Sequence, residues 1–304
     1  MSEAYPSPRR WSDEELETAA VAATTDFVTE RQAQGSAVYR EVFDDAMTVV
    51  RRLFAVTDDL RALVNGDPLP DGRTFLDAAR YLDGPPVSES DLRTIVEVSA
   101  AAEESAGTIS GHIASVIVAG LDRERFPWLF RPTISAPTET ERDMAVRWTA
   151  ALWAVQRSAT RRRGEAAGRQ EQNVKALLQG HDFEEVPRRV ILRVGDLDPG
   201  QFCPEAVTGG VKCDVPIRLR NGYLLLIECK VSSSGVNSVK RLNHETGNKA
   251  REWSRTFGEQ AHTMAVLTGV FRKVNLLRAQ NHQNIYLVWE RDLAPLGEFL
   301  DRAS

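Results

Sequence analysis

Apolar residues recur at helical spacing through much of the first half of the chain. In the segments 41–63 and 109–121 they repeat every three or four positions, as they do on the buried face of an amphipathic helix. The segment 88–98 opens with serine and acidic residues, which is typical of a helix start. We therefore expect residues 1–160 to form a mostly helical region.

Two further patterns indicate where helices begin and end. Thr138 is followed three residues later by Glu141, the spacing at which the two side chains cap the first N–H groups of a helix. We expect that helix to run through Trp153. A separate helical pattern covers 163–178 and stops before Gly180, a residue that is common just after a helix end.

The pattern changes after about residue 160, where short apolar runs alternate with polar segments. A polar, glycine- and proline-containing loop is expected at 196–210, a polar helix at 238–257, and a last helix around Leu296. The expected strands are 186–194, 212–219, 223–231, 263–271 and 285–289. This order predicts an α/β fold with a core at 161–304 and a helical N-terminal partner.

Two of the expected strands are joined by the short segment 220–222 and carry a notable group of charges. Asp214 stands near the start of the first strand, and Glu228 and Lys230 stand near the end of the second. A two-residue connection would pair Asp214 with Cys229, because side chains alternate between the two faces of a strand. Asp214 would then point away from the other two charges.

A three-residue connection ending in a left-handed Gly222 is also a common hairpin. It would pair Asp214 with Glu228, and Lys212 with Lys230, so that the acids and Lys230 share one face. The apolar pattern on the opposite face fits either connection, so it does not decide between them. The chemistry of the charges favours the three-residue connection.

Two carboxylates held side by side repel each other unless a cation lies between them. Oxygen ligands of this kind suit Mg²⁺, which polarises a phosphate and lowers the pKa of a bound water. Lys230 would stabilise negative charge on the reacting phosphate or position the attacking water. The alternative is a plain ion pair on the sheet surface. Against it, Glu228 ends an apolar run, Leu224–Ile227, where exposed charges are unexpected.

An acid, a hairpin and then Glu-x-Lys form a pattern that resembles the PD-(D/E)xK nuclease superfamily. The resemblance implies a restriction-endonuclease-like core, with a mixed sheet flanked by helices, and Mg²⁺ as cofactor. It implies Asp214, Glu228 and Lys230 as catalytic residues, with Asp214, Glu228 and the backbone carbonyl of Cys229 as metal ligands. Cys213 stands where the superfamily has proline, and Pro216 within the first strand implies an edge or a bulge.

A narrower resemblance is to the XamI/SalI group of type II restriction endonucleases. It rests on the continuation 232–241 with Lys249, on Phe126-Pro-Trp128, on the helix 163–178 and on the chain length. The resemblance implies a homodimer that cuts both strands of a short palindrome, which in that group is GTCGAC. It also implies a restriction–modification system, with a DNA methyltransferase as functional partner.

Polar residues after the second strand are of the types that read base edges or hold phosphates. A solvated helix face is the alternative. The expected DNA contacts are Asn237, Ser238, Lys240, Arg241, Asn243, His244 and Lys249. Glu171, in the preceding helix, is a candidate for a further catalytic carboxylate, the alternative being a surface residue that pairs with an arginine.

Composition indicates a soluble globular protein, and the net charge argues against a protein that simply coats DNA. The 304 residues are 42% hydrophobic and 27% charged, and no apolar run is long enough to cross a membrane. The net charge is −5, but residues 151–304 carry +6 and the remainder −11, and a basic half is a weak indication of a polyanionic partner. Three scattered cysteines and the absence of a signal-like start predict a cytoplasmic protein with free thiols.

These observations lead to a type II restriction endonuclease that acts on double-stranded DNA. A repair, recombination or transposon-associated nuclease with the same fold is the first alternative. A non-catalytic DNA-binding protein on a nuclease scaffold is the second, and the complete Asp214, Glu228 and Lys230 set argues against it.

Overall fold

The fold is described from a computed structural model that covers residues 6–102 and 108–303. Contacts between residues divide the chain into two compact units. The sheet unit consists of Met1–Ala33 and Arg162–Ser304, and the helical unit consists of Gln34–Arg161. The sequence indicated a single boundary near residue 160. The first residues group with the C-terminal part because Leu16, Ala20 and Ala23 share a buried apolar cluster with its last strands.

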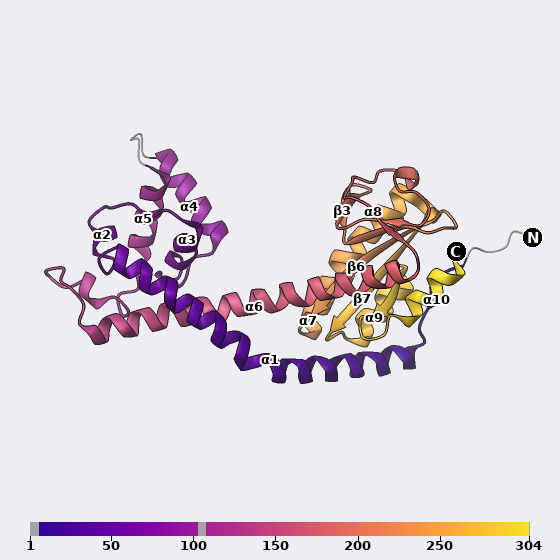
Figure 1. The fold of residues 1–304 in the computed structure, drawn as a ribbon, viewed down its shortest axis with the longest axis horizontal. Coiled ribbons are helices and arrows are strands. Elements are labelled where there is room, and N and C mark those ends of the chain that lie inside the picture. The colour runs from indigo at the N-terminus through magenta and orange to yellow at the C-terminus, as the bar shows by residue number, and fades with distance from the viewer. Residues whose placement is uncertain (1–5, 103–107, 304) are drawn as a thin grey trace, which may run out of the picture. The chain divides into compact units, whose positions relative to one another are not determined.

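The structure contains more helix than the sequence patterns indicated. The α-helices are α1 (Asp13–Val56), α2 (Arg61–Val64), α3 (Arg73–Ala79), α4 (Glu89–Ala102), α5 (Ile109–Gly120), α6 (Glu139–Gly180), α7 (Gly235–Ser238), α8 (Gly247–Phe257), α9 (Lys273–His282) and α10 (Ala294–Arg302) (Figure 1). The π-helix η3 (Val239–Thr246) joins α7 to α8, and the short 3₁₀ helices are η1 (Pro127–Leu129), η2 (Val194–Asp196) and η4 (Gly258–Gln260). No helix among the described residues is long and apolar enough to cross a membrane.

The cap expected at the start of α6 is confirmed. The Thr138 N–H donates to Glu141 Oε2 at 2.8 Å, and the Glu141 N–H donates to Thr138 Oγ1 at 3.2 Å. The two helices expected on either side of residue 160 are one continuous helix, because the residues between them, 154–162, include no proline and no glycine to interrupt it.

The helical unit is built around buried aromatic residues. Phe54, Phe126 and Trp128 pack against one another with ring centroids 5.7–6.3 Å apart, and the Trp128 indole donates to the Asp59 carbonyl at 3.0 Å. The buried Arg125 guanidinium donates to carbonyl oxygens of residues 81–83 and to Asp122. The Phe-Pro-Trp motif at 126–128 therefore lies in the core of this unit.

The sheet unit is organised by one six-stranded mixed sheet. Its strand order is β1-β2-β5-β6-β7-β8, and β6, β7 and β8 run parallel to one another while β5 is antiparallel to β6. The strands of this sheet are β1 (Glu184–Glu185), β2 (Gln201–Phe202), β5 (Val215–Arg218), β6 (Leu224–Ser232), β7 (Ala261–Gly269) and β8 (Ile285–Trp289). A separate two-stranded sheet pairs β3 (Ala206–Thr208) with β4 (Val211–Cys213).

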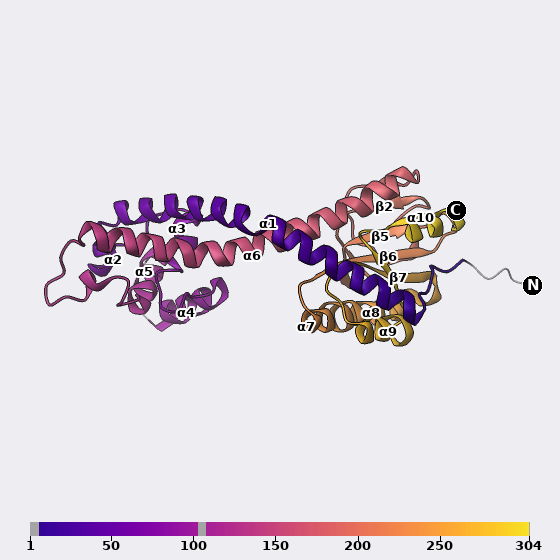
Figure 2. The same cartoon turned by 90° about the horizontal axis from the view of Figure 1, so that it is seen from below.

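Helices cover both faces of the six-stranded sheet, as the α/β prediction required. Figure 2 shows α6 and α10 on one side of the strands and α7, α8 and α9 on the other. Val174 and Leu178 of α6 share a buried cluster with Ile227 of β6 on the first face. Because β6 lies inside the sheet between covered faces, charged residues on it are held in a protected setting.

Two strand predictions are wrong in an informative way. The segment expected as a strand at 186–194 is irregular and makes only a single bridge, between Ile191 and Thr208, since Pro187 lacks a backbone donor. The strand expected at 212–219 is broken at Asp214 into β4 and β5. Lys212 consequently pairs with Val207 of β3, and the predicted pairing of Lys212 with Lys230 does not occur.

Candidate active site

The turn between β5 and β6 fixes which residues meet across these strands. The Leu219 N–H donates to the Tyr223 carbonyl at 2.8 Å, and Gly222 has φ +92°, in the left-handed region. The connection therefore has three residues, and the register pairs Val215 with Ile227. One position further along, Asp214 comes beside Glu228, as the chemistry of the charges predicted.

The side chain of Asp214 takes the place of a backbone hydrogen-bond acceptor beside β6. It stands between β4 and β5, where the main chain leaves one sheet for the other. Its Oδ2 accepts the Cys229 N–H at 2.7 Å, a bond that a backbone carbonyl would supply in a continuous ladder. The Asp214 carboxylate is thus held by the main chain of β6.

Pro216 does not mark an edge or a bulge. Its carbonyl accepts from the Cys203 N–H at 3.2 Å, so its polar groups point toward β2 and away from β6. Alternate residues of a strand direct their backbone groups to opposite sides, so the missing N–H costs β6 no hydrogen bond. β5 is an internal strand at this point because the two residues of β2 cover it.

Glu228 is fully buried and bonded by two lysines. Its Oε2 lies 2.7 Å from Nζ of Lys230, which is also 3.7 Å from Asp214 Oδ2. Nζ of Lys249, from α8, lies 2.8 Å from Oε1 and 2.7 Å from Oε2. A carboxylate that is 0% exposed remains charged only with such compensation, because desolvation strongly disfavours the ionised form.

The pKa shifts at this site follow from burial and from neighbouring charges. Burial raises the pKa of Glu228, which Lys230 opposes, and the charge of Asp214 raises it further. Burial works to lower the pKa of Lys230, but the charges of Glu228 and Asp214 outweigh that effect, so the pKa is raised. The lysine ammonium is therefore held in its charged form beside two acids.

Glu171 belongs to the same electrostatic group. It is half-buried on α6, and burial together with the charge of Asp214 raises its pKa, against the opposing charge of Lys175. The preceding residue, Gln170, is anchored to β7 because its side-chain amide donates to the Val266 carbonyl at 3.0 Å. This anchor holds the helix against the sheet at the residue next to Glu171.

The donor set fits a hard divalent cation. Asp214 and Glu228 offer carboxylate oxygens, and the charge of Asp214 adds to the rise that burial causes in the pKa of Glu228, a repulsion that a cation would relieve. β5 begins opposite Ile227, two residues before Cys229 on β6. The Cys229 carbonyl therefore points beyond the start of β5 and not into the hydrogen bonds between β5 and β6. Among the described residues, no three His, Cys, Asp or Glu side chains form a metal-holding group. Such a cation would therefore depend on the carbonyl and on water, as Mg²⁺ does.

Comparison with known proteins decides the family. The profile of the XamI restriction endonuclease family matches residues 60–289. The type II restriction enzyme XamI of Xanthomonas campestris pv. amaranthicola is 37% identical over 263 residues, which are 83% of this chain and 93% of that enzyme. The chain belongs to the XamI restriction endonuclease family. No solved structure matches it.

Family membership confirms the predicted class of enzyme, a restriction endonuclease, and the resemblance on which it was based. The six-stranded mixed sheet with helices on both faces agrees with the predicted fold class. The matched range includes Asp214, Glu228, Lys230 and Lys249, and also much of the helical unit.

Two residues that we expected to contact DNA in this family member are buried instead. Ser238 accepts a hydrogen bond from Asn275 Nδ2 at 2.7 Å, and Asn243 Nδ2 donates to the Asn275 carbonyl at 3.0 Å. Both side chains therefore fasten the segment 235–246 to α9 and cannot reach DNA. Asn243 lies in the π-helix, whose wider turn gives it a phase that a regular helical pattern does not predict, whereas Ser238 is the last residue of α7.

The other expected DNA contacts are accessible, with one exception. Asn237, Lys240 and His244 are exposed, and Arg241 is half-buried beside Glu245. Lys249 is the exception, because its ammonium lies on Glu228. No local pattern could indicate this contact, since Lys249 is 21 residues from Glu228 along the chain.

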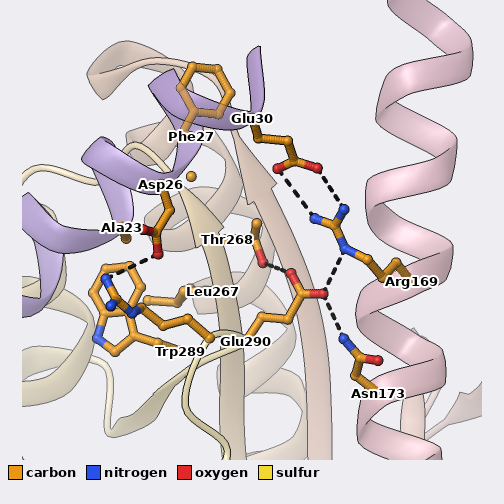
Figure 3. A pocket seen from close by; sticks show the side chains of 12 residues that line it. Ala23, Asp26, Phe27, Glu30, Arg169, Asn173, Leu267, Thr268, Trp289 and Glu290 are labelled. Atoms are coloured by element: carbon orange, nitrogen blue, oxygen red, sulfur yellow. Dashed lines mark hydrogen bonds and ion pairs between the residues drawn. The ribbon is translucent and has the colours of Figure 1, made fainter. Parts of the chain in front are cut away.

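A second polar cluster lies where β7 and β8 end. A cavity of about 260 Å³ is framed by α1 and α6, and Figure 3 shows Arg169 between Glu30 and Glu290. Arg169 lies 2.6 Å from Glu30 and 3.1 Å from Glu290, and Asn173 donates to Glu290 at 3.0 Å. These charged groups form ion pairs with one another, so the cluster links α1 and α6 to the sheet next to Glu171.

Proposed function

We propose that this protein is a type II restriction endonuclease that uses Mg²⁺ to hydrolyse both strands of DNA at a short palindromic site. The observation that carries the proposal is the meeting of Asp214, Glu228 and Lys230 at the end of β5 and on β6, in a chain of the XamI family. The family resemblance makes GTCGAC the first site to test. Such an enzyme acts in the cytoplasm, on incoming DNA that a cognate methyltransferase has not modified.

The residues of the site divide the work. Asp214, Glu228 and the Cys229 carbonyl would hold the metal, which when bound would polarise a phosphate and lower the pKa of a water. Lys230 is charged, and its contacts with both acids place its ammonium where negative charge would develop on the phosphate. Glu171 has a raised pKa and lies within the electrostatic influence of Asp214, which suits it to accept a proton from the attacking water.

DNA contacts outside the site come from the segment that follows β6. Asn237, Lys240, Arg241 and His244 have accessible side chains and belong to the residue types that bind phosphates and base edges. The buried hydrogen bonds of Ser238 and Asn243 hold this segment in place.

The test of function is incubation of the purified chain with unmethylated phage DNA, in Mg²⁺ or in EDTA. Discrete fragments that require Mg²⁺ and share one end sequence are expected, and their loss in Asp214→Asn assigns the cutting to this site. The matched control is Lys273→Met, a change of one half-exposed charge on α9 that leaves the site intact. A smear would favour a repair-type nuclease, and binding without cutting would refute catalysis.

A homodimer is part of the proposal, since two active sites are needed to cut both strands of a palindrome. It is supported by an apolar stripe on the helical-unit part of α6, formed by Met144, Trp148, Leu152 and Val155, with Trp148 51% exposed. Isolated chains rarely expose such a continuous row. The stripe repeats at intervals of three or four residues, the spacing of a helix-pairing face.

The mass in solution tests this part. Light scattering should give twice the chain mass of 33.8 kDa for the natural sequence. Trp148→Glu should give the single-chain mass, because a buried, unpaired charge disfavours the interface. Thr48→Glu, which introduces the same charge at an exposed position of a different helix, α1, is the matched control and should stay dimeric. A dimeric Trp148→Glu would place the interface elsewhere.

A further inference from the structure

Lys249 contacts both oxygens of the buried Glu228 carboxylate. Its Nζ reaches both oxygens of Glu228, at 2.8 and 2.7 Å, while Lys230 approaches only Oε2, at 2.7 Å. Glu228 is a proposed metal ligand, so these oxygens are the atoms that a divalent cation must reach. An ammonium bonded to both of them lies on the approach of any such cation.

A divalent cation and two ammonium groups cannot share one carboxylate without strong repulsion. One lysine contact must open when a metal binds. Lys230 is held on β6, has a side chain only 9% exposed, and is also close to Asp214. The side chain of Lys249 comes from a neighbouring helix and is 23% exposed, and a second acid, Glu205, acts on it only from beyond ion-pair distance. It is therefore the group that can leave.

We propose that Lys249 is an internal counter-ion that competes with the metal for Glu228. It keeps the buried carboxylate ionised and in position before the metal arrives, and it is displaced toward solvent when the metal binds. Lys249 is thus a positioning residue that acts through Glu228. This inference rests on the proposed function, in which Glu228 is a metal ligand.

The competition predicts that removing the ammonium strengthens metal binding. We would measure Mn²⁺ binding to the whole chain without DNA, from the electron paramagnetic resonance signal of the free ion. Mn²⁺ prefers the same oxygen ligands as Mg²⁺. Lys249→Met should bind Mn²⁺ at least about tenfold more tightly than the natural sequence, because a full positive charge is lost beside the ligand.

Two variants separate competition from general effects of substitution. Lys249→Arg keeps the charge and should bind Mn²⁺ as the natural sequence does. Lys273→Met removes one positive charge on α9, where the lysine pairs with Glu17 at 3.3 Å, and should also leave Mn²⁺ binding unchanged. A tightening in Lys273→Met equal to that in Lys249→Met would reduce the effect to net charge and overturn the inference.

The rise in unfolding temperature that Mn²⁺ produces is a readout that a merely structural lysine would not move. Metal-free Lys249→Met should unfold at a lower temperature than the natural sequence, since Glu228 loses a counter-ion. Saturating Mn²⁺ should raise its unfolding temperature by more than it raises that of the natural sequence. A lower unfolding temperature with unchanged or weaker Mn²⁺ affinity would make Lys249 a structural ion-pair partner only, and would overturn the inference.

The failure of this inference is distinguishable from failure of the proposed function. Equal Mn²⁺ affinities in Lys249→Met and the natural sequence would overturn the competition, while Mg²⁺-dependent cutting stands on its own assay. Glu228→Gln should lose Mn²⁺ binding. If it binds Mn²⁺ as the natural sequence does, Glu228 is not a metal ligand, and both the competition and the proposed metal site are wrong.

Discussion

Asp214 serves two purposes, and a pair of substitutions separates them. Its carboxylate is a proposed metal ligand, and its Oδ2 also accepts the Cys229 N–H at 2.7 Å. Asp214→Asn removes the charge but keeps an oxygen for that hydrogen bond. Asp214→Ala removes both. Each should reduce cutting at least about a hundredfold, because a group that organises charge in the transition state is lost.

The two variants should differ in stability. A buried donor left without a partner costs about 1–3 kcal/mol, and Cys229 is a buried residue of β6. The relief of repulsion on Glu228 is the same in both variants, so it cancels in the comparison. For a unit of this size, 1 kcal/mol shifts the unfolding temperature by about 2–4 °C. Asp214→Ala should therefore unfold at least about 2 °C below Asp214→Asn.

Calorimetry of the two variants, in EDTA and at one pH, measures this difference directly. The natural sequence in EDTA is the reference, and a DNA-cutting assay in Mg²⁺ verifies that both variants are inactive. Identical unfolding temperatures for Asp214→Ala and Asp214→Asn would refute the reasoning, because the Cys229 N–H would then have another acceptor.

Three further outcomes are expected. Burial raises the pKa of Asp83 to about 7, against the opposing charge of Arg125, so the folded state binds more protons than the unfolded one between about pH 4 and 7 and loses stability as the pH rises. Asp83→Asn should unfold at a higher temperature than the natural sequence at pH 8 but not at pH 4, and equal shifts at both would contradict this. Asn243→Ala should lower the unfolding temperature. Lys240→Ala should leave the unfolding temperature unchanged but weaken DNA binding and reduce the salt dependence of that binding, both measured by fluorescence anisotropy. The opposite pattern would reverse the two assignments. Gly269→Ala should destabilise the sheet unit by several kcal/mol in urea unfolding, since φ is +94° and a Cβ would lie 2.1 Å from the Ser232 carbonyl oxygen, and an unchanged midpoint would show that the β6–β7 end can rearrange.

Much of the site could be predicted because its signals are local. Gly222 marked the turn, and the alternation of apolar residues left only two registers, between which the grouping of Asp214 and Glu228 decided. The break of the strand at Asp214 could not be predicted, because residues 211–219 have continuous strand character. The hydrogen bond from the Cys229 N–H to the Asp214 side chain permits the break. That bond joins two residues that are far apart along the chain.

Other features depend on contacts that no local pattern records. The first helix begins at Asp13, but its early residues show only a weak apolar pattern, and their burial depends on the distant β7 and β8. The inward direction of Asn243 depends on a π-helix, in which each turn uses more residues than a regular helix.

The bond between Asp214 and Cys229 also bears on how relatives of this enzyme would lose function. A strand that borrows a side-chain oxygen requires a residue with an oxygen at that position, whether or not the protein still cuts DNA. A lineage released from selection for cutting would therefore be free to lose Lys230 early, yet would keep Asp or Asn at position 214 for the sake of folding. An acid at position 214 is therefore weaker evidence that a relative still cuts DNA than a lysine at position 230.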